Sequence, residues 1–172
     1  IKIGNITIPN VFQNSFVNPI VSYKNWYLGS MLIFQNSLDK STQEAISKIY
    51  FPKSEKVYIS SSRIGYKFKK QNINFNYTNI SANGRYLMPR EWGRDPFYTF
   101  IPRERNEGMG GINAFSLNYL YNFSKQLNVN FAAGSYLLAD VTNSKLNKYS
   151  MPSYNQYFLQ ADYTCKGWFE GL

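Results

Sequence analysis

Residues 114–138 read AFSLNYLYNFSKQLNVNFAAGSYLL and contain the clearest structural pattern of the chain. Apolar and polar residues alternate on both sides of a short polar segment at residues 124–126. Such alternation is typical of a β-strand with one apolar and one polar face, and a short polar break between two alternating runs is typical of a hairpin. The stretch therefore predicts two antiparallel strands joined by a tight turn.

The same alternation extends outward from this hairpin, through residues 57–69, 72–79 and 156–165. Tight turns are predicted at residues 70–71, 124–126 and 166–168, whereas the links between hairpins are long and span residues 36–56, 80–111 and 141–154. Successive connections of an up-and-down barrel lie on opposite sides, and outer-membrane barrels have short turns on one side and long loops on the other. The spacing therefore predicts an all-β fold, a transmembrane antiparallel β-barrel.

The polar face of the predicted strands is rich in amide side chains, which are costly to bury without partners and suit a water-filled lumen. Its members include Asn72, Asn74, Asn76, Asn118, Asn122, Asn128, Asn130, Gln160 and Asp162. The apolar face would then contact lipid, with an aromatic girdle near the short turns formed by Tyr119, Tyr121, Tyr163 and Trp168. Alternating strands with a solvated polar face also describe a soluble β-sandwich, which stays open as the alternative.

The first third of the chain has weaker patterns. Residues 1–9 predict a short strand that ends at Pro9, residues 10–19 an irregular segment rich in asparagine, and residues 20–35 one or two strands. Within the following link, Ser41 and Glu44 have the spacing of a capping box, so residues 41–51 predict a short helix-like insert.

The whole chain has 172 residues, a formal net charge of +9, one cysteine and no histidine. We expect residues 1–172 to form a single β-barrel domain that is incomplete, because both ends read as interrupted strands. Without histidine the chain lacks the commonest general base and zinc ligand, and it has no Gly-x-Ser-x-Gly motif. We therefore expect no enzyme activity, catalytic residue, cofactor or metal, although spacing alone leaves paired carboxylates such as Asp95 and Glu104 open.

Residues 85–107, RYLMPREWGRDPFYTFIPRERNE, contain five of the six arginines of the chain, interleaved with acids and aromatic residues. Pro89, Pro96 and Pro102 argue against a long helix or a central strand here. The sequence therefore predicts an irregular charged loop, at about residues 83–111, that narrows the passage through the barrel. Paired charges that only brace the loop are the alternative, whereas Trp92, Phe97, Tyr98 and Phe100 are expected to pack it against the wall.

This loop also carries a family resemblance. The run PREWGRDPFYTFIPRERNEG at residues 89–108 resembles a segment of OprD-type outer-membrane porins, particularly the versions found in Bacteroidetes-like bacteria. The hairpin at residues 114–138 and the closing KGWFEGL at residues 166–172 are similar to the same family, whereas residues 1–9 match it more weakly. The resemblance implies a larger barrel of about 18 strands, of which this chain is a fragment.

The resemblance further implies passive, substrate-preferring diffusion of small solutes, often carboxylate-bearing nutrients, past basic and acidic groups at a constriction. By position, the candidate basic residues are Arg90, Arg94, Arg103 and Arg105, and the candidate acidic residues are Glu91, Asp95, Glu104 and Glu107. Arginine suits this role because its planar fork binds carboxylates in two-point fashion and stays charged.

A porin in the bacterial outer membrane is therefore the expected function. Its expected partners are small solutes and outer-membrane lipid or lipopolysaccharide, with a larger outer-membrane complex left open and no nucleic acid. The alternative is a soluble or surface β-domain that binds glycan or nucleic acid through basic and aromatic residues, since the positive charge also suits polyanions. Detergent-dependent extraction separates the two hypotheses.

Overall fold

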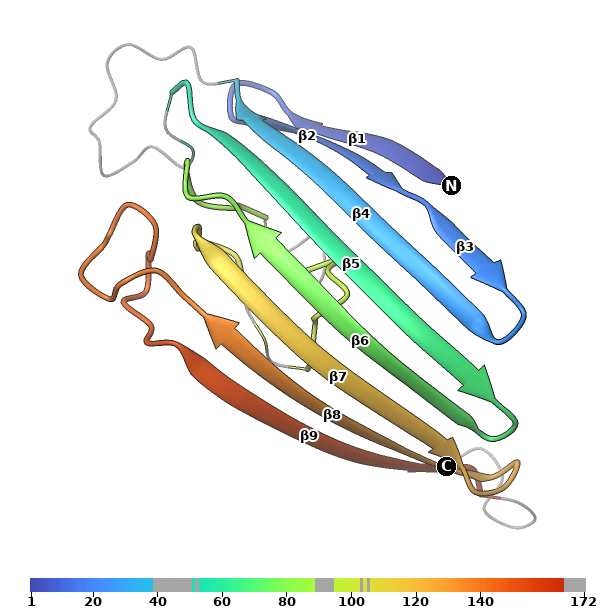
Figure 1. The fold of residues 1–172 in the computed structure, drawn as a ribbon. Helices are drawn as coiled ribbons and strands as arrows, with labels where there is room; N and C mark the ends of the chain where they lie inside the picture. The colour runs from blue at the N-terminus through green and yellow to red at the C-terminus, as the bar shows by residue number, and fades with distance from the viewer. Residues whose placement is uncertain (39–50, 52, 89–94, 103, 105, 166–172) are drawn as a thin grey trace.

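The computed structural model describes residues 1–38, 51, 53–88, 95–102, 104 and 106–165, and these form one antiparallel sheet (Figure 1). Its nine strands are β1 (Lys2–Ile8), β2 (Phe12–Asn18), β3 (Ile20–Tyr23), β4 (Trp26–Ser37), β5 (Lys56–Phe68), β6 (Gln71–Ile80), β7 (Ile112–Asn122), β8 (Leu127–Leu137) and β9 (Tyr154–Tyr163). No described helix is long and apolar enough to cross a membrane. The all-β prediction is confirmed.

Strand order follows chain order, from β1 through β2, β4, β5, β6, β7 and β8 to β9, and each neighbouring pair is antiparallel. Strands β2 and β3 both pair with β4, so they act as one strand interrupted at Pro19, which has no N–H to donate. The sheet is open, because β1 and β9 end the path without pairing with each other in the described residues. This is the up-and-down connectivity of the prediction, and a closed barrel is not formed by these strands.

The connections differ between the two ends of the sheet. At one end, which we call the short-turn end, tight turns join β3 to β4, β5 to β6 and β7 to β8. At the other, the long-link end, residues 38–55, 81–111 and 138–153 make long connections. The predicted alternation of short and long connections is confirmed from β3 to β9, with the β5–β6 turn at residues 69–70, one position earlier than expected. The turn expected at residues 166–168 lies outside the described residues.

The two faces of the sheet have opposite character. One, the outer face, carries large apolar side chains that are exposed, among them Leu28, Leu32, Ile64, Phe75, Leu117, Phe131 and Leu159. The other, the inner face, carries polar residues in its middle, and Asn76, Thr78 and Ser116 there are fully or almost fully buried. The alternation assigned to β5, β6, β7, β8 and β9 from sequence is therefore confirmed, with the apolar side exposed.

The described residues of the segment 81–111, which we call the inner-face loop, cover the inner face toward the long-link end (Figure 1). Its buried residues Tyr86, Leu87, Phe97 and Met109 join wall residues such as Ile59 in one hydrophobic cluster. Burial of these apolar side chains away from water is the main driving force that holds the loop against the sheet. The core of the protein therefore lies between the wall and its own loop.

The N-terminal prediction was wrong in one place. Residues 12–18, expected to be irregular, form strand β2, whose register places Phe12 opposite Ser37 and Phe16 opposite Ile33 of β4. The strand expected at residues 1–9 is confirmed as β1, and residues 20–35 form β3 and most of β4. The helix-like insert expected at residues 41–51 lies outside the described residues except for Phe51, which is buried against Phe12.

Candidate functional site: the inner face and its loop

The inner-face loop is fastened to the wall by polar contacts with six strands. Several wall side chains bind loop backbone groups, as Ser61 Oγ does in accepting from the Tyr98 N–H at 2.9 Å. The other contacts are made by Asn18 of β2, Gln35 of β4, Arg63 of β5, Thr78 of β6, Tyr136 of β8 and Gln156 of β9. Loop groups that would otherwise be buried without partners are thus satisfied by side chains of these six strands.

Amide and hydroxyl side chains form a continuous network on the inner face. Asn76 Nδ2 donates to Asn74 Oδ1 at 2.9 Å and to Ser116 Oγ at 3.0 Å. Asn118 Nδ2 donates to the same Asn74 oxygen at 3.2 Å, so strands β6 and β7 are joined through their side chains. Partly satisfied buried amides would destabilise a fold, whereas a paired network of this kind makes the surface rigid.

Arg63 lies between the wall and the loop. Its Nε donates to Asn76 Oδ1 at 2.6 Å, its Nη2 donates to the Tyr98 carbonyl at 3.3 Å, and its guanidinium lies 4.5 Å from the centre of the Tyr98 ring. No carboxylate of the described chain forms an ion pair with it. Within the part of the chain that the structure describes, no carboxylate balances the charge of Arg63, which therefore contributes positive potential to the inner face.

Lys67 extends this positive potential toward the short-turn end. It occupies the same face of β5 as Arg63, with Gly65 between them, and its Nζ lies 5.3 Å from the centre of the Tyr27 ring. The Tyr27 ring fills the space above Gly65, where an added Cβ would lie 2.1 Å from the ring carbon Cζ. Tyr27 Oη also donates to Asn72 Oδ1 at 2.7 Å. Arg63 and Lys67 therefore form a column of two cations, each beside a tyrosine ring.

Glu104 is buried at the opposite side of the inner face. Its Oε2 accepts from the Ile101 N–H and from Tyr136 Oη, both at 3.0 Å, and its Oε1 accepts from Asn106 Nδ2 at 2.7 Å. The pKa of Glu104 is raised to about 7, mainly by burial and to a lesser extent by the nearby Asp95 carboxylate, against the lowering effect of the hydrogen bonds that it accepts. Glu104 is the described acid whose charge changes near neutral pH.

Two other predicted acids also bind protein groups. Asp95 Oδ2 accepts from the Asn106 N–H at 2.9 Å and from its Nδ2 at 3.3 Å, so one asparagine joins Asp95 to Glu104. Glu107 forms an ion pair with Lys148, with Oε1 3.6 Å from Nζ, and accepts from Tyr149 Oη at 2.7 Å. Glu107 therefore connects the inner-face loop to the link between β8 and β9, a bracing contact rather than a contact with solvent.

The structure places only part of the residue set predicted from sequence. Asp95, Glu104 and Glu107 all lie on the inner-face loop, where Asp95 and Glu104 come together and Glu107 binds elsewhere. The other five predicted residues, Arg90, Glu91, Arg94, Arg103 and Arg105, lie outside the described residues. Phe97 and Tyr98 pack against the wall as expected, whereas Trp92 is not among the residues described.

Two inner-face cations were not in that predicted set. Arg63 and Lys67 lie on the polar face of β5, whereas Ile64 and Phe68 lie on its other, apolar face. This alternation in the sequence could have identified both cations as inner-face residues. Their aromatic partners had no comparable signal. Tyr27 comes from a strand of mixed pattern, and the pairing of Arg63 with Tyr98 depends on the path of the loop.

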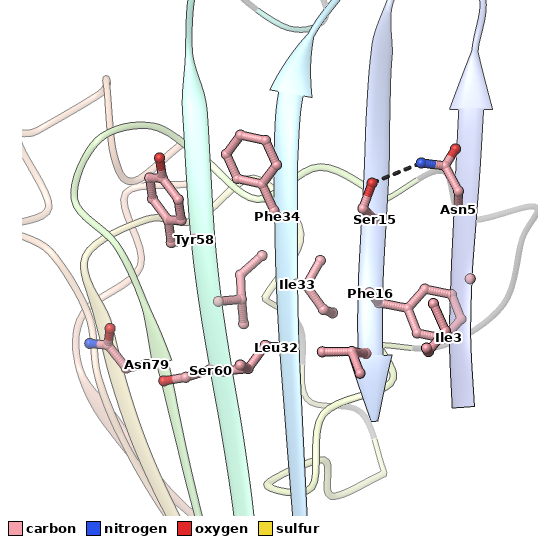
Figure 2. A pocket seen from close by; sticks show the side chains of 13 residues that line it. Ile3, Asn5, Ser15, Phe16, Leu32, Ile33, Phe34, Tyr58, Ser60 and Asn79 are labelled. Atoms are coloured by element: carbon pink, nitrogen blue, oxygen red, sulfur yellow. Dashed lines mark hydrogen bonds between the residues drawn. The ribbon is translucent and has the colours of Figure 1, made fainter. Parts of the chain in front are cut away.

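The outer face has a hollow near the N-terminal edge of the sheet. It is an open depression of ≈ 790 Å³, lined mainly by outer-face side chains of β1, β2, β4 and β5. Figure 2 shows Phe34 and Tyr58 together at one end and Leu32, Phe16 and Ile3 toward the other. The Phe34 and Tyr58 ring centres are 5.0 Å apart. The hollow is therefore an apolar surface, without the charged groups that mark the inner face.

No protein-family model, curated protein or solved structure matches this chain. The resemblance to OprD-type porins stays a prediction from the sequence.

Proposed function

We propose that the chain is part of an outer-membrane porin through which small solutes diffuse passively. The observation that carries the proposal is the distribution of side chains over the two faces. The exposed outer face is apolar, with Leu117 41% and Leu159 72% exposed, whereas the polar inner face is the one covered by the chain's own loop. A soluble sheet buries its apolar face, so the arrangement here is the one expected in contact with lipid.

The open sheet supports a larger barrel. Strands β1 and β9 have unpaired edges in the described residues, and exposed edges are absent from a hydrocarbon environment because their backbone groups would lack partners. We propose that further strands close the sheet into a barrel of about 18 strands in the bacterial outer membrane. Lipid or lipopolysaccharide would then cover the outer face, and a larger outer-membrane complex is compatible with the same arrangement.

The solute class follows from the charges of the inner face. Arg63 and Lys67 form no ion pair with described carboxylates, and the polar network beside them is neutral. Asp162, an exposed acid of the same face, lies on β9, four strands away from β5. Such a surface attracts anions while screening by water lets them leave, as passive diffusion requires. We propose carboxylate-bearing nutrients as solutes, with the arginines of the inner-face loop, Arg90, Arg94, Arg103 and Arg105, as additional contacts.

Two measurements on the full-length protein test this proposal. It should require detergent for extraction from membranes and migrate differently on gels before and after heating, as closed barrels do. In planar bilayers it should conduct ions with a preference for anions, and Arg94→Ala or Arg103→Ala should reduce that preference. A protein that stays soluble without detergent and binds glycans or nucleic acid in a salt-dependent way would contradict the proposal.

A further inference from the structure

Tyr98 of the inner-face loop lies in a socket of the wall formed by Asn18, Gly29, Ser61 and Arg63. Its Oη donates to Asn18 Oδ1 at 2.7 Å, and its backbone N–H donates to Ser61 Oγ at 2.9 Å. Its carbonyl accepts from Arg63 Nη2 at 3.3 Å, and its ring faces the guanidinium at 4.5 Å. One loop residue is therefore fixed at its hydroxyl, ring, N–H and carbonyl by three different strands.

The socket depends on a missing side chain. Gly29 of β4 is buried beneath the ring, and an added Cβ at this position would lie 2.6 Å from Tyr98 Oη and 2.8 Å from Cζ. Such distances are shorter than any real contact, so the ring could not keep its place above an alanine. On the other side Arg63 is itself held by Asn76 at 2.6 Å, which keeps the guanidinium beneath the loop.

The position of the socket along the loop gives it a mechanical role. The segment from Tyr98 to Glu104 crosses the inner face, and Tyr98 anchors it on β2, β4 and β5. The later anchors of the same segment are on β6, β8 and β9: Thr99 donates to Thr78 at 2.8 Å, and the Pro102 carbonyl accepts from Gln156 at 2.6 Å. Tyr98 is thus the anchor that connects this segment to the N-terminal strands.

We infer that the Tyr98 socket sets how far the inner-face loop stands from the wall and so determines the width of the passage beside it. Tyr98 and Arg63 are positioning residues in this role, acting through the loop. The inference rests on the proposed porin function, which it extends by naming the contact that fixes the constriction. Loss of the Tyr98 side chain removes its contacts with Asn18 of β2, Gly29 of β4 and the Arg63 guanidinium of β5. The backbone bonds of residue 98 to β5 and the anchors on β6, β8 and β9 stay in place.

The test is a mutant cycle in the full-length protein reconstituted in planar bilayers. Tyr98→Ala should change the single-channel conductance by about two-fold, because conductance follows the open cross-section. Gly29→Ala should change it in the same direction, and the double variant should equal Tyr98→Ala alone, because both act on one contact. Gly4→Ala is the matched control: an added Cβ at Gly4 would lie 2.4 Å from the ring of Phe16, which is not part of the socket, so this variant should show no coupling to Tyr98→Ala.

Limited trypsin digestion supplies a second readout, because Arg85 and four further arginines lie within residues 85–107. Cleavage there should be faster in Tyr98→Ala and Gly29→Ala than in the wild type and in Gly4→Ala. A conducting wild type together with an unchanged conductance in Tyr98→Ala overturns this inference alone. A wild type that does not conduct overturns the proposed function, and digestion then still shows whether Tyr98 seats the loop.

Discussion

The Gln35 side chain makes both hydrogen bonds of a peptide group with Leu87. Its Nε2 donates to the Leu87 carbonyl at 2.7 Å, and its Oε1 accepts from the Leu87 N–H at 3.0 Å. Both residues are almost fully buried, so neither backbone group of Leu87 can turn to water instead. A side chain of β4 thus substitutes for a neighbouring strand and holds the start of the inner-face loop.

Gln35→Leu should destabilise the fold by about 2–4 kcal/mol, because the two buried backbone groups of Leu87 lose their partners. Asn36→Leu is a matched control, because it also replaces an amide side chain with leucine, but on the outer face of the same strand. The temperature at which the folded form converts to the slower-migrating form on gels measures the effect. Equal transition temperatures for the two variants would show that the Gln35 contact contributes little.

Glu104 should make stability depend on pH. Its pKa is about 7 in the folded protein against an ordinary value of 4.5, so the folded state holds more protons than the unfolded state between these values. The contribution of Glu104 to the free energy of unfolding should therefore be largest below pH 4.5. This contribution should fall by about 3 kcal/mol as the pH rises through 7.

Glu104→Gln, which stays neutral, should remove this fall. Unfolding transitions recorded at pH 5 and pH 8 for wild type and variant compare the two directly. A fall of the same size in Glu104→Gln would assign the pH dependence to another group.

A charge placed on the outer face should be far more costly than the same charge on the inner face. Leu117 and Asn118 are consecutive residues of β7 that point to opposite faces. Leu117→Arg should destabilise the protein in lipid by about 2–4 kcal/mol, the cost of an arginine near the middle of the bilayer. Asn118→Arg should cost less, because its charge meets the polar inner face. Refolding yields into lipid vesicles at several urea concentrations measure both, and equal losses would argue against a lipid-facing outer surface.

Lys67 should contribute to ion selectivity. Lys67→Gln removes one cation of the inner-face column beside Tyr27, so the preference for anions should decrease. Lys56→Gln is its control, because Lys56 lies on the same strand with an exposed side chain on the outer face. Reversal potentials across a salt gradient in planar bilayers report the preference. A larger shift with Lys56→Gln than with Lys67→Gln would contradict the assignment of faces.

The sequence predicted strands best where alternation is strict. In β6, for example, Ile73 and Phe75 are exposed on the outer face while Asn74 and Asn76 point to the inner face, so period-two patterning was clear. In β2 the pattern is absent, because Phe12 and Phe16 join Asn14 on the inner face, beside the hydrophobic cluster that the loop completes. Strand β2 was missed because its inner face is partly an apolar core, so the residues on that side are mixed.

The contacts of the candidate site were less accessible to sequence reasoning. Charge and proline content were enough to predict an ordered loop between β6 and β7. They could not show that Glu104 would meet Tyr136, or that Tyr98 would lie above Gly29, because these pairs are separated by 32 and 69 positions and depend on the path of the loop. Gly29 lies within a strand rather than a turn, so no local backbone conformation requires a glycine there. The close approach of the Tyr98 ring is what excludes a larger side chain at this position.

Among the residues that the structure describes, the inner-face loop covers the long-link end of the inner face and leaves the short-turn end bare. Near the long-link end Val57, Ile80 and Ile112 are completely buried, whereas Asn122, Gln160 and Asp162 near the short-turn end are exposed. A solute entering from the bare end would meet an open vestibule before the constriction, and one entering from the covered end would meet the constriction first. Transport through such an asymmetric path should rectify, with currents of unequal size when the voltage is reversed.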